Sequence, residues 1–199
     1  ASGNTYEQWQ PQHFWPVQII SDKVPMFPTL GNHEQNSTHH FNYMSLPGNE
    51  VYYSFDYAGI HIICLDSNAG STPYQAGTPQ YEWLIKDLEA NQNAEWTFVY
   101  FHHPLFRCQP TRGIEAQRYT WHPIFEKYGV DLVLSGHDHY YFRSYPICKL
   151  GLEPKQGVRY LTSGGVGASL YPVSERIYGA VSKSIHHTIV LDVQGRRIE

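Results

Sequence analysis

Short, almost uninterrupted apolar runs alternate along this chain with segments of helical periodicity, and this alternation restricts the fold more than any other feature. The runs at 97–101 and 131–135 are typical of strands that are buried on both faces. Apolar residues recur at i, i+3, i+4 and i+7 from Tyr81 and again from Trp121. We therefore expect an α/β domain in which helices cover a largely parallel sheet.

The ends of these segments carry recognisable turn and cap residues. Thr78 and Pro79 are placed to begin the first helix, and Gly129 is placed to end the second. The β-rich runs 51–56 and 59–65 are separated only by Tyr57–Ala58, so they are predicted to form a hairpin.

Other segments give weaker signals. Residues 24–30 form an apolar run that ends at Gly31, and we expect a strand there. The first twenty residues are poorly periodic and suggest an interrupted helix. Further strands are expected in the tail, at 140–147, 158–162 and 186–193.

Length and charge exclude several classes of protein. The 199 residues suit a single domain over 1–199, since domains hold about 150 residues. The formal net charge is −4 without any run of Lys or Arg, which argues against a nucleic-acid or anionic-membrane surface. No apolar stretch reaches the about 18 residues needed to span a bilayer, so we expect no membrane contact. Three cysteines without a C-x-x-C spacing exclude a thiolate zinc knuckle and a dithiol redox motif.

Histidines follow three of the apolar runs, in the segments Gly31–Glu34, His102–Pro104 and Gly136–His139. Ligands of open α/β sheets bind at the carboxyl ends of strands, so we expect these segments to converge on one crevice. On an extended backbone His137 and His139, at i and i+2, would face the same side. They could then reach different ions of a two-metal site, with ions about 3.5–4 Å apart.

Each cluster taken alone has a simpler explanation. Most His-x-His pairs lie at a surface or strand edge, Gly-Asn favours a turn, and a proline often ends a strand. His39–His40 and His186–His187 are expected at the surface. The combination favours a metal site, because several buried imidazoles without partners would be costly.

The same residues resemble the later motif blocks of the calcineurin-like metallophosphoesterases. The resemblance rests on GNHE at 31–34, His102-x-Pro104 and GHDH at 136–139, and it covers roughly residues 1–195. The wider segments GHDHYYFRSYP and YLTSGGVGASLY are most similar to the purple acid phosphatase branch. The resemblance implies a two-sheet β-sandwich flanked by helices, with a dinuclear metal centre that hydrolyses phosphate monoesters.

The resemblance also assigns roles to individual residues. Asn32, His102 and His137 match ligands of the second metal, and His139 matches a ligand of the first. His33 matches the histidine that contacts the substrate phosphate and protonates the leaving oxygen. The implied cofactors are two metal ions, iron with zinc, manganese or iron, and the implied partner is a small-molecule phosphate ester.

Three further residues have lesser roles in this comparison. Glu34 matches a neighbour of the catalytic histidine. His103 is the less favoured alternative to His102 as the metal ligand, and we expect it to lie beside the substrate. Arg143 falls on a family position that we interpret as structural.

Two earlier motif blocks of the family are absent from residues 1–199. They supply the bridging carboxylate, a second carboxylate and a tyrosine ligand, and Ala1–Asn4 resembles the small polar residues that come directly after the second block in this branch. We therefore expect an N-terminally incomplete fragment in which the first metal keeps only His139, so that metal binding is poor and activity weak or lost. Asp66 is the only nearby carboxylate, and the resemblance makes it structural.

Alternatives stay open at this point. One is a phosphodiesterase or nucleotidase of the same superfamily, and another is a non-catalytic binding module with a degenerate phosphatase fold. Cys108 and Cys148 could form a disulfide, whereas Cys64 is expected to be a buried thiol. Low charge, abundant tyrosine and that bridge would favour an extracellular or periplasmic protein.

Overall fold

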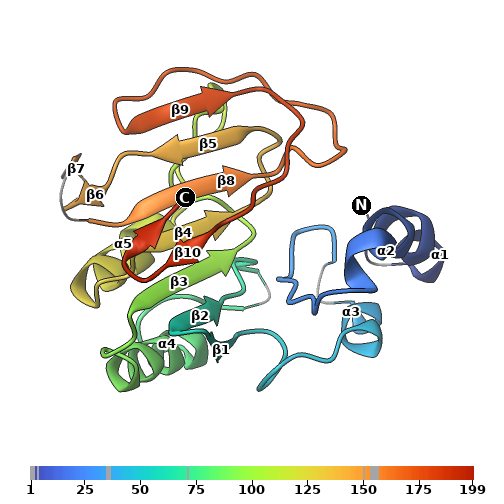
Figure 1. Cartoon of the computed structure of the whole chain (residues 1–199), viewed down its shortest axis with the longest axis horizontal. Coiled ribbons are helices and arrows are strands. Elements are labelled where there is room, and N and C mark those ends of the chain that lie inside the picture. The colour runs from blue at the N-terminus through green and yellow to red at the C-terminus, as the bar shows by residue number, and fades with distance from the viewer. Residues whose placement is uncertain (1–2, 4, 35–36, 71, 150, 153–156) are drawn as a thin grey trace.

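A seven-stranded mixed sheet organises the protein, which we describe from a computed structural model (Figure 1). The structure describes residues 3, 5–34, 37–70, 72–149, 151–152 and 157–199. The central strands β2, β3, β4 and β8 are parallel, whereas β1, β5 and β9 run antiparallel to their neighbours. In sheet order the strands are β1 (Tyr53–Tyr57), β2 (Ile60–Cys64), β3 (Trp96–Phe101), β4 (Leu132–Ser135), β8 (Arg159–Ser163), β5 (Tyr141–Ser144) and β9 (Gly179–Lys183).

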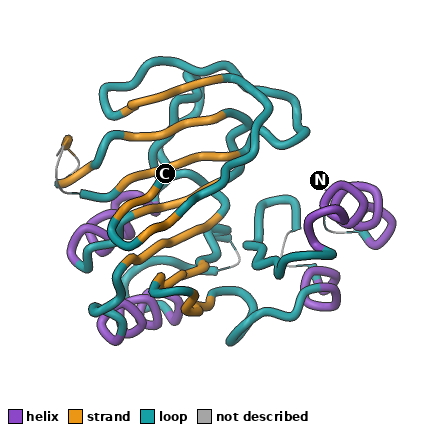
Figure 2. The backbone as a smooth tube through the Cα atoms, in the orientation of Figure 1, coloured by secondary structure: helices purple, strands orange, loops and turns teal. Residues whose placement is uncertain are grey.

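Helices α4 (Pro79–Ala90) and α5 (Gln117–Lys127) cover one face of this sheet (Figures 1 and 2). The main core lies between them and the sheet, and it includes the fully buried side chains of Trp121 and Phe125. The predicted α/β class, a large sheet flanked by helices, is confirmed.

The opposite face carries a smaller apolar cluster. Side chains of the sheet, such as Phe98 and Leu132, pack there against Leu191 and Val193 of the C-terminal segment. That segment ends in a short hairpin of β10 (Val193–Gln194) and β11 (Arg197–Ile198). In the described part of the chain, the second layer expected of a two-sheet sandwich therefore consists of this hairpin and extended chain. Another two-stranded piece, β6 (Ile147–Cys148) with β7 (Gly151–Leu152), lies beyond the ends of β5 and β8, where Ile147 pairs with Val158 (Figure 1).

The predicted hairpin and helices form with small shifts. The turn between β1 and β2 falls at Ala58–Gly59, one residue later than predicted, with φ values of 49° and 82°. Such a turn matches the twist of the two strands. Helix α4 begins at Pro79 with Thr78 as its N-cap residue, as expected, but the Thr78 hydroxyl donates to the Gln75 carbonyl and makes no capping hydrogen bond. Gly129, at φ 71°, follows α5 in the left-handed conformation.

Two strand predictions are wrong. Residues 24–30 form no strand, because Pro25 and Pro28 lack the N–H groups that a ladder needs. Most of 186–193 is likewise extended chain outside any ladder, with only Val193 in β10. Strand β9 was not predicted, since its short sequence GAVSK has no clear alternation.

The N-terminal residues form the interrupted helix that the sequence suggested. Helix α1 (Tyr6–Trp9) and helix α2 (Trp15–Ser21) are joined by the π-helical turn Gln10–Phe14, which contains Pro11. A separate short helix, α3 (Thr38–Tyr43), lies nearby. The interrupted helix and α3 lie to one side of the sheet (Figure 1). None of the helices in the described residues is long and apolar enough to cross a membrane.

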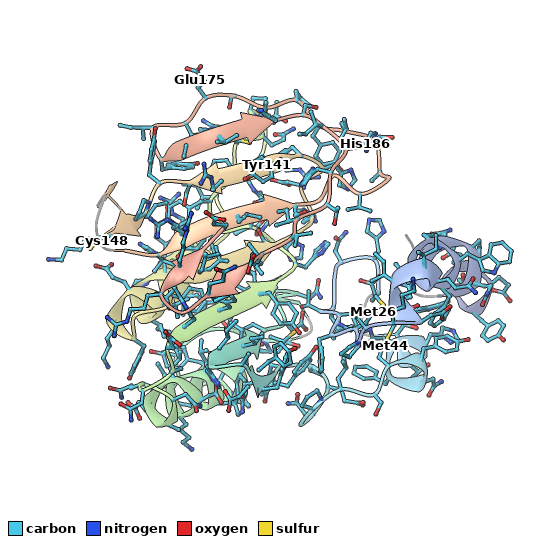
Figure 3. All side chains as sticks on the ribbon, in the orientation of Figure 1. Met26, Met44, Tyr141, Cys148, Glu175 and His186 are labelled. Carbon is cyan, nitrogen blue, oxygen red and sulfur yellow. The ribbon has the colours of Figure 1, made fainter. Side chains whose placement is uncertain are left out.

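The disulfide hypothesis is wrong. Cys108 is a fully buried thiol, and Cys148 donates a hydrogen bond from Sγ to Oε1 of Glu126, 2.8 Å away. Cys148 lies on the β6 side of the molecule, at the far edge of the sheet from the N-terminal helices (Figure 3). Cys64 is a buried thiol, as predicted.

A buried histidine ties the β1–β2 hairpin to α4. His61 is 3% exposed, and its Nδ1 and Nε2 lie 2.7 Å from Asp56 and 2.8 Å from Asp87. Burial by itself lowers the pKa of His61, but hydrogen bonds to Asp87 and Asp56 and the charges of both carboxylates outweigh it. The net result is a pKa above the ordinary value of 6.5.

Because this pKa is raised on folding, the stabilisation from His61 is complete below pH 6.5 and is lost as the pH rises through the folded-state pKa. We expect His61→Gln to lower the free energy of unfolding by about 2 kcal/mol at pH 5. The loss should be smaller at pH 9, as measured by urea denaturation. The control His39→Gln, on α3, should show no such difference, and an equal loss at both pH values for His61→Gln would contradict this role.

Candidate metal centre

Asn32, His102 and His137 bring three donor atoms together at the carboxyl ends of the central strands. His102 follows β3, His137 follows β4, and Asn32 lies on the loop after residues 24–30. Nε2 of His102 is 2.7 Å from Oδ1 of Asn32 and 3.1 Å from Nδ1 of His137. Nδ1 of His137 is also 3.1 Å from Oδ1 of Asn32. Three side chains distant in sequence thus form one triangle of donors.

The triangle has the size of a coordination face. Nitrogen and oxygen ligands lie about 2.0–2.2 Å from a divalent transition metal, so neighbouring ligands of an octahedral ion are about 3 Å apart. The three separations of 2.7, 3.1 and 3.1 Å match that spacing. Imidazole and amide oxygen suit a borderline divalent ion.

Both imidazoles of the triangle are kept neutral. Burial, and then the neighbouring histidines, lower the pKa of His102 to about 3. Burial, followed by His103 and His102, lowers the pKa of His137 to about 2. A neutral ring keeps a lone pair on one nitrogen, which is the form that binds a metal.

The backbone after β4 turns sharply and separates the two histidines of the GHDH segment. His137 has φ 62°, a left-handed conformation that non-glycine residues adopt only where surrounding contacts require it. The expectation of an extended backbone over 137–139 is therefore wrong. His139 donates from Nδ1 to the carbonyl of Ser169 and stacks on Tyr171, and it does not join the three other donors.

A third imidazole lies beside the triangle. His103 packs against His137 with ring centroids 4.4 Å apart, and its Nδ1 is 2.9 Å from the hydroxyl of Ser67. It lines an open cavity of about 460 Å³ together with Asn32, Ser67 and Glu115. Of the three triangle residues, Asn32 lines this cavity.

The loop that carries Asn32 holds two more predicted site residues. His33 is exposed, and it is close enough to His102 for its charge to lower the pKa of that ring. Glu34 accepts a hydrogen bond at Oε2 from the Gly31 amide, 2.8 Å away, and so fixes the turn.

Asp138 is the residue that sequence reasoning missed. Its carboxylate is fully buried between Arg112, at 2.6 Å, and Arg107, at 3.2 Å, and accepts a hydrogen bond from Tyr140. Arg112 also lies 4.9 Å from the ring centre of Tyr171, on which His139 stacks. Asp138 therefore anchors the segment between the two histidines. An acidic residue flanked by histidines, with two arginines in the loop between β3 and α5, could have indicated this.

Two other predicted residues lie outside the triangle. Asp66 is fully buried and accepts hydrogen bonds from Asn68 and Thr72, which agrees with a structural role. Arg143 is exposed on β5 and lines a groove with Arg159 on the sheet face opposite α5.

The sequence model of the calcineurin-like phosphoesterase family matches residues 3–141. Purple acid phosphatase 15 of Arabidopsis thaliana is 30% identical over 81% of this chain and 34% of its own length. Phosphoenolpyruvate phosphatase of Allium cepa is 33% identical over 72% of this chain and 30% of its length. This chain belongs to the calcineurin-like phosphoesterase family, so the resemblance seen in its motifs is confirmed.

Solved structures agree on the fold. The purple acid phosphatase PPD1 from yellow lupin superposes with a TM-score of 0.70 at 20% identity, over 92% of this chain and 39% of that chain. GAP50 of Plasmodium superposes with a TM-score of 0.58 at 16% identity, over 81% of this chain and 56% of that chain. The chain spans about a third of the length of the curated relatives that it matches.

Gly31 is required by the close approach of the His102 ring. A Cβ at Gly31 would lie 2.9 Å from the ring and from Glu34, whereas a Cβ at Gly136 would lie 3.7 Å from the same ring. We expect Gly31→Ala to lower the free energy of unfolding by about 1–3 kcal/mol, because the loop must shift. The matched control Gly136→Ala should change it by less than about 1 kcal/mol. If chemical denaturation showed equal losses for Gly31→Ala and Gly136→Ala, the close approach of the His102 ring would not be what requires glycine at position 31.

Proposed function

We propose that Asn32, His102 and His137 hold one divalent metal ion of a dinuclear centre that hydrolyses phosphate monoesters, with His139 as a ligand of the other ion. The observation that carries this proposal is the triangle of donor atoms with separations of 2.7, 3.1 and 3.1 Å. When bound, such ions supply Lewis-acid stabilisation of the charge on phosphoryl oxygens. We propose iron with zinc, manganese or a second iron.

The absence of charge on the three ligand atoms determines how many metal ions this chain binds tightly. All three atoms of the triangle are neutral donors, and the buried Asp138 and Asp66 are held by other partners. Two cations about 3.5–4 Å apart repel strongly unless a carboxylate lies between them. We therefore expect this chain to bind one ion at the triangle and a second only weakly.

The remaining site residues act on the substrate. The exposed imidazole of His33 stands next to the triangle, where it can hydrogen-bond the phosphate and give a proton to the leaving oxygen. His103 borders the cavity that would hold the ester, and Glu34 holds the Gly31 turn in place. These positions suit a small-molecule phosphate ester.

Wider properties follow from the family and the composition. We propose that residues 1–199 all belong to a single catalytic domain, since the family model covers 3–141 and the sheet continues to β9. The names of the relatives, which include acid phosphatases and a phosphoenolpyruvate phosphatase, support a monoesterase. We also propose an extracellular or periplasmic location, which is supported by the low fraction of charged residues, 16%.

Metal binding can be measured directly with Co²⁺. We expect saturable binding in calorimetry and visible absorption, and His102→Ala and His137→Ala should each weaken it by at least about tenfold. His187→Ala is the matched control, because this histidine contacts Ser163 and lies outside the triangle. Binding that survives both ligand substitutions would contradict the proposed centre.

The role of His33 predicts a dependence on the leaving group. In a full-length protein that carries the complete metal centre, the change equivalent to His33→Ala should lower kcat about 10²–10⁴-fold with an alkyl phosphate, whose leaving oxygen needs a proton. The loss should be much smaller with 4-nitrophenyl phosphate, which leaves as a stable anion. Equal losses with the two esters would rule out proton donation by His33. Faster hydrolysis of bis(4-nitrophenyl) phosphate than of the monoester would favour the phosphodiesterase alternative.

A further inference from the structure

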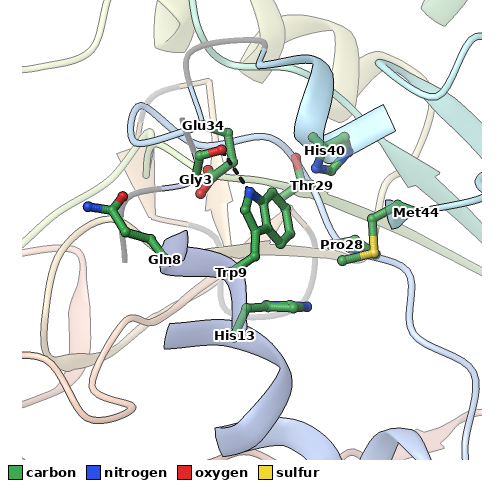
Figure 4. A pocket seen from close by; sticks show the side chains of 9 residues that line it. All are labelled: Gly3, Gln8, Trp9, His13, Pro28, Thr29, Glu34, His40 and Met44. Carbon is green, nitrogen blue, oxygen red and sulfur yellow. Dashed lines mark hydrogen bonds between the residues drawn. The ribbon is translucent and has the colours of Figure 1, made fainter. Parts of the chain in front are cut away.

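A second cavity lies among the N-terminal helices and is bordered by Glu34 (Figure 4). Its volume of about 110 Å³ is several times the roughly 10–15 Å³ that one water molecule needs, so it admits a molecule of a few heavy atoms. The lining residues come from α1 and the residue Gly3 before it, the π-helical turn, the segment 28–34, and α3 with its C-cap. They are Gly3, Gln8, Trp9, His13, Pro28, Thr29, Glu34, His40 and Met44.

Two buried polar atoms of this cavity lack a partner in the described part of the chain. His40, which was expected at the surface, is only 2% exposed, and its Nε2 makes no hydrogen bond. Oε1 of Gln8 is buried without a partner as well. Leaving a buried acceptor unsatisfied is costly, so Oε1 of Gln8 favours a bound molecule that donates a hydrogen bond to it.

The third polar group is the carboxylate of Glu34. Oε2 of this residue is occupied by the Gly31 amide, whereas Oε1 lies toward Gly3. A Cβ on Gly3 would come within 2.9 Å of Oε1, so the absence of a side chain at this position keeps room beside the carboxylate. The wall formed by Gln8 and Glu34 therefore consists of hydrogen-bond acceptors.

The other walls are aromatic and apolar. The indole N–H of Trp9 donates to the carbonyl of Gly3, and this bond fixes the ring at the edge of the cavity. Met44 and Pro28 complete the apolar side, and Figure 4 shows Trp9 between His13 and Glu34. An indole face attracts cations, and a thioether is a soft contact for alkyl groups.

The charge of the residues that line the cavity indicates which charge a ligand should carry. Burial lowers the pKa values of His13 and His40 below 6.5, so both rings are neutral at pH 7. The formal charge that remains is the negative charge of Glu34. An anion would be repelled, and a neutral alcohol would leave the carboxylate without a counter-charge.

We propose that this cavity binds a small primary ammonium ion. Its N–H groups donate to Oε1 of Glu34 and Oε1 of Gln8, and its short alkyl part packs against Trp9 and Met44. The site is separate from the Asn32–His102–His137 triangle, and Glu34 connects the two because its other oxygen holds Gly31.

The test is a titration of the metal-free chain with ethylammonium chloride, followed by the NMR signal of the Trp9 indole N–H. We expect saturable binding in about the millimolar range, as suits a ligand of three non-hydrogen atoms. Ethanol and sodium acetate, of similar size but neutral and negative, should bind at least about tenfold more weakly. Equal binding of ethanol, or no saturable shift with ethylammonium, would overturn the proposal.

Two substitutions locate the ligand. Glu34→Gln keeps an oxygen for the Gly31 amide but removes the charge, and it should weaken ethylammonium binding at least about tenfold. Gln8→Leu, on the same wall, should weaken it several-fold. The matched control is Glu82→Gln. Glu82 lies on α4, and its carboxylate accepts a hydrogen bond from the Gly77 amide, so this change should leave ethylammonium binding unaffected. Unchanged affinity in both Glu34→Gln and Gln8→Leu would place the ion elsewhere. Neither metal nor catalysis enters the measurement, so its outcome is independent of the proposed phosphatase function.

Discussion

The parallel pairing of β3 with β4 is the constraint on which the rest of the site depends. Phe101 lies opposite Ser135 in this ladder, and the Gly136 amide donates to the carbonyl of His102 just beyond it. Both strands therefore end at the same level, and the residues that come after them are held side by side. A slip of the register would move His102 away from His137 and leave the donor atoms scattered.

Several local features then complete the geometry. The missing side chain of Gly31 lets its loop approach the His102 ring, which brings Asn32 to the other two donors. The left-handed conformation of His137 turns its ring back toward them. The buried Asp138 holds this segment through its two arginine partners, and its backbone amide donates to the carbonyl of Gly136 across the turn.

The loop at Gly31–Glu34 joins two regions of different character. On one side it carries a group of neutral nitrogen and oxygen donors that fits a divalent metal ion. On the other side Glu34 borders a small acceptor-rich cavity beneath the N-terminal helices. The hydrogen bond between Glu34 and Gly31 is the direct connection between these regions, since the side chain that borders the cavity also holds the loop of Asn32.

By itself the sequence determined the α/β class, both large helices, the hairpin and the identity of three residues that meet, because these depend on local periodicity and on motifs. Only the tertiary structure decided that His139 turns away to Ser169, that residues 24–30 pair with no strand, and that Cys108 and Cys148 stay separate. It also decided the burial of Asp138 and His40. These outcomes depend on contacts between residues far apart in the chain, whose packing, charge pairing and backbone strain no local pattern records.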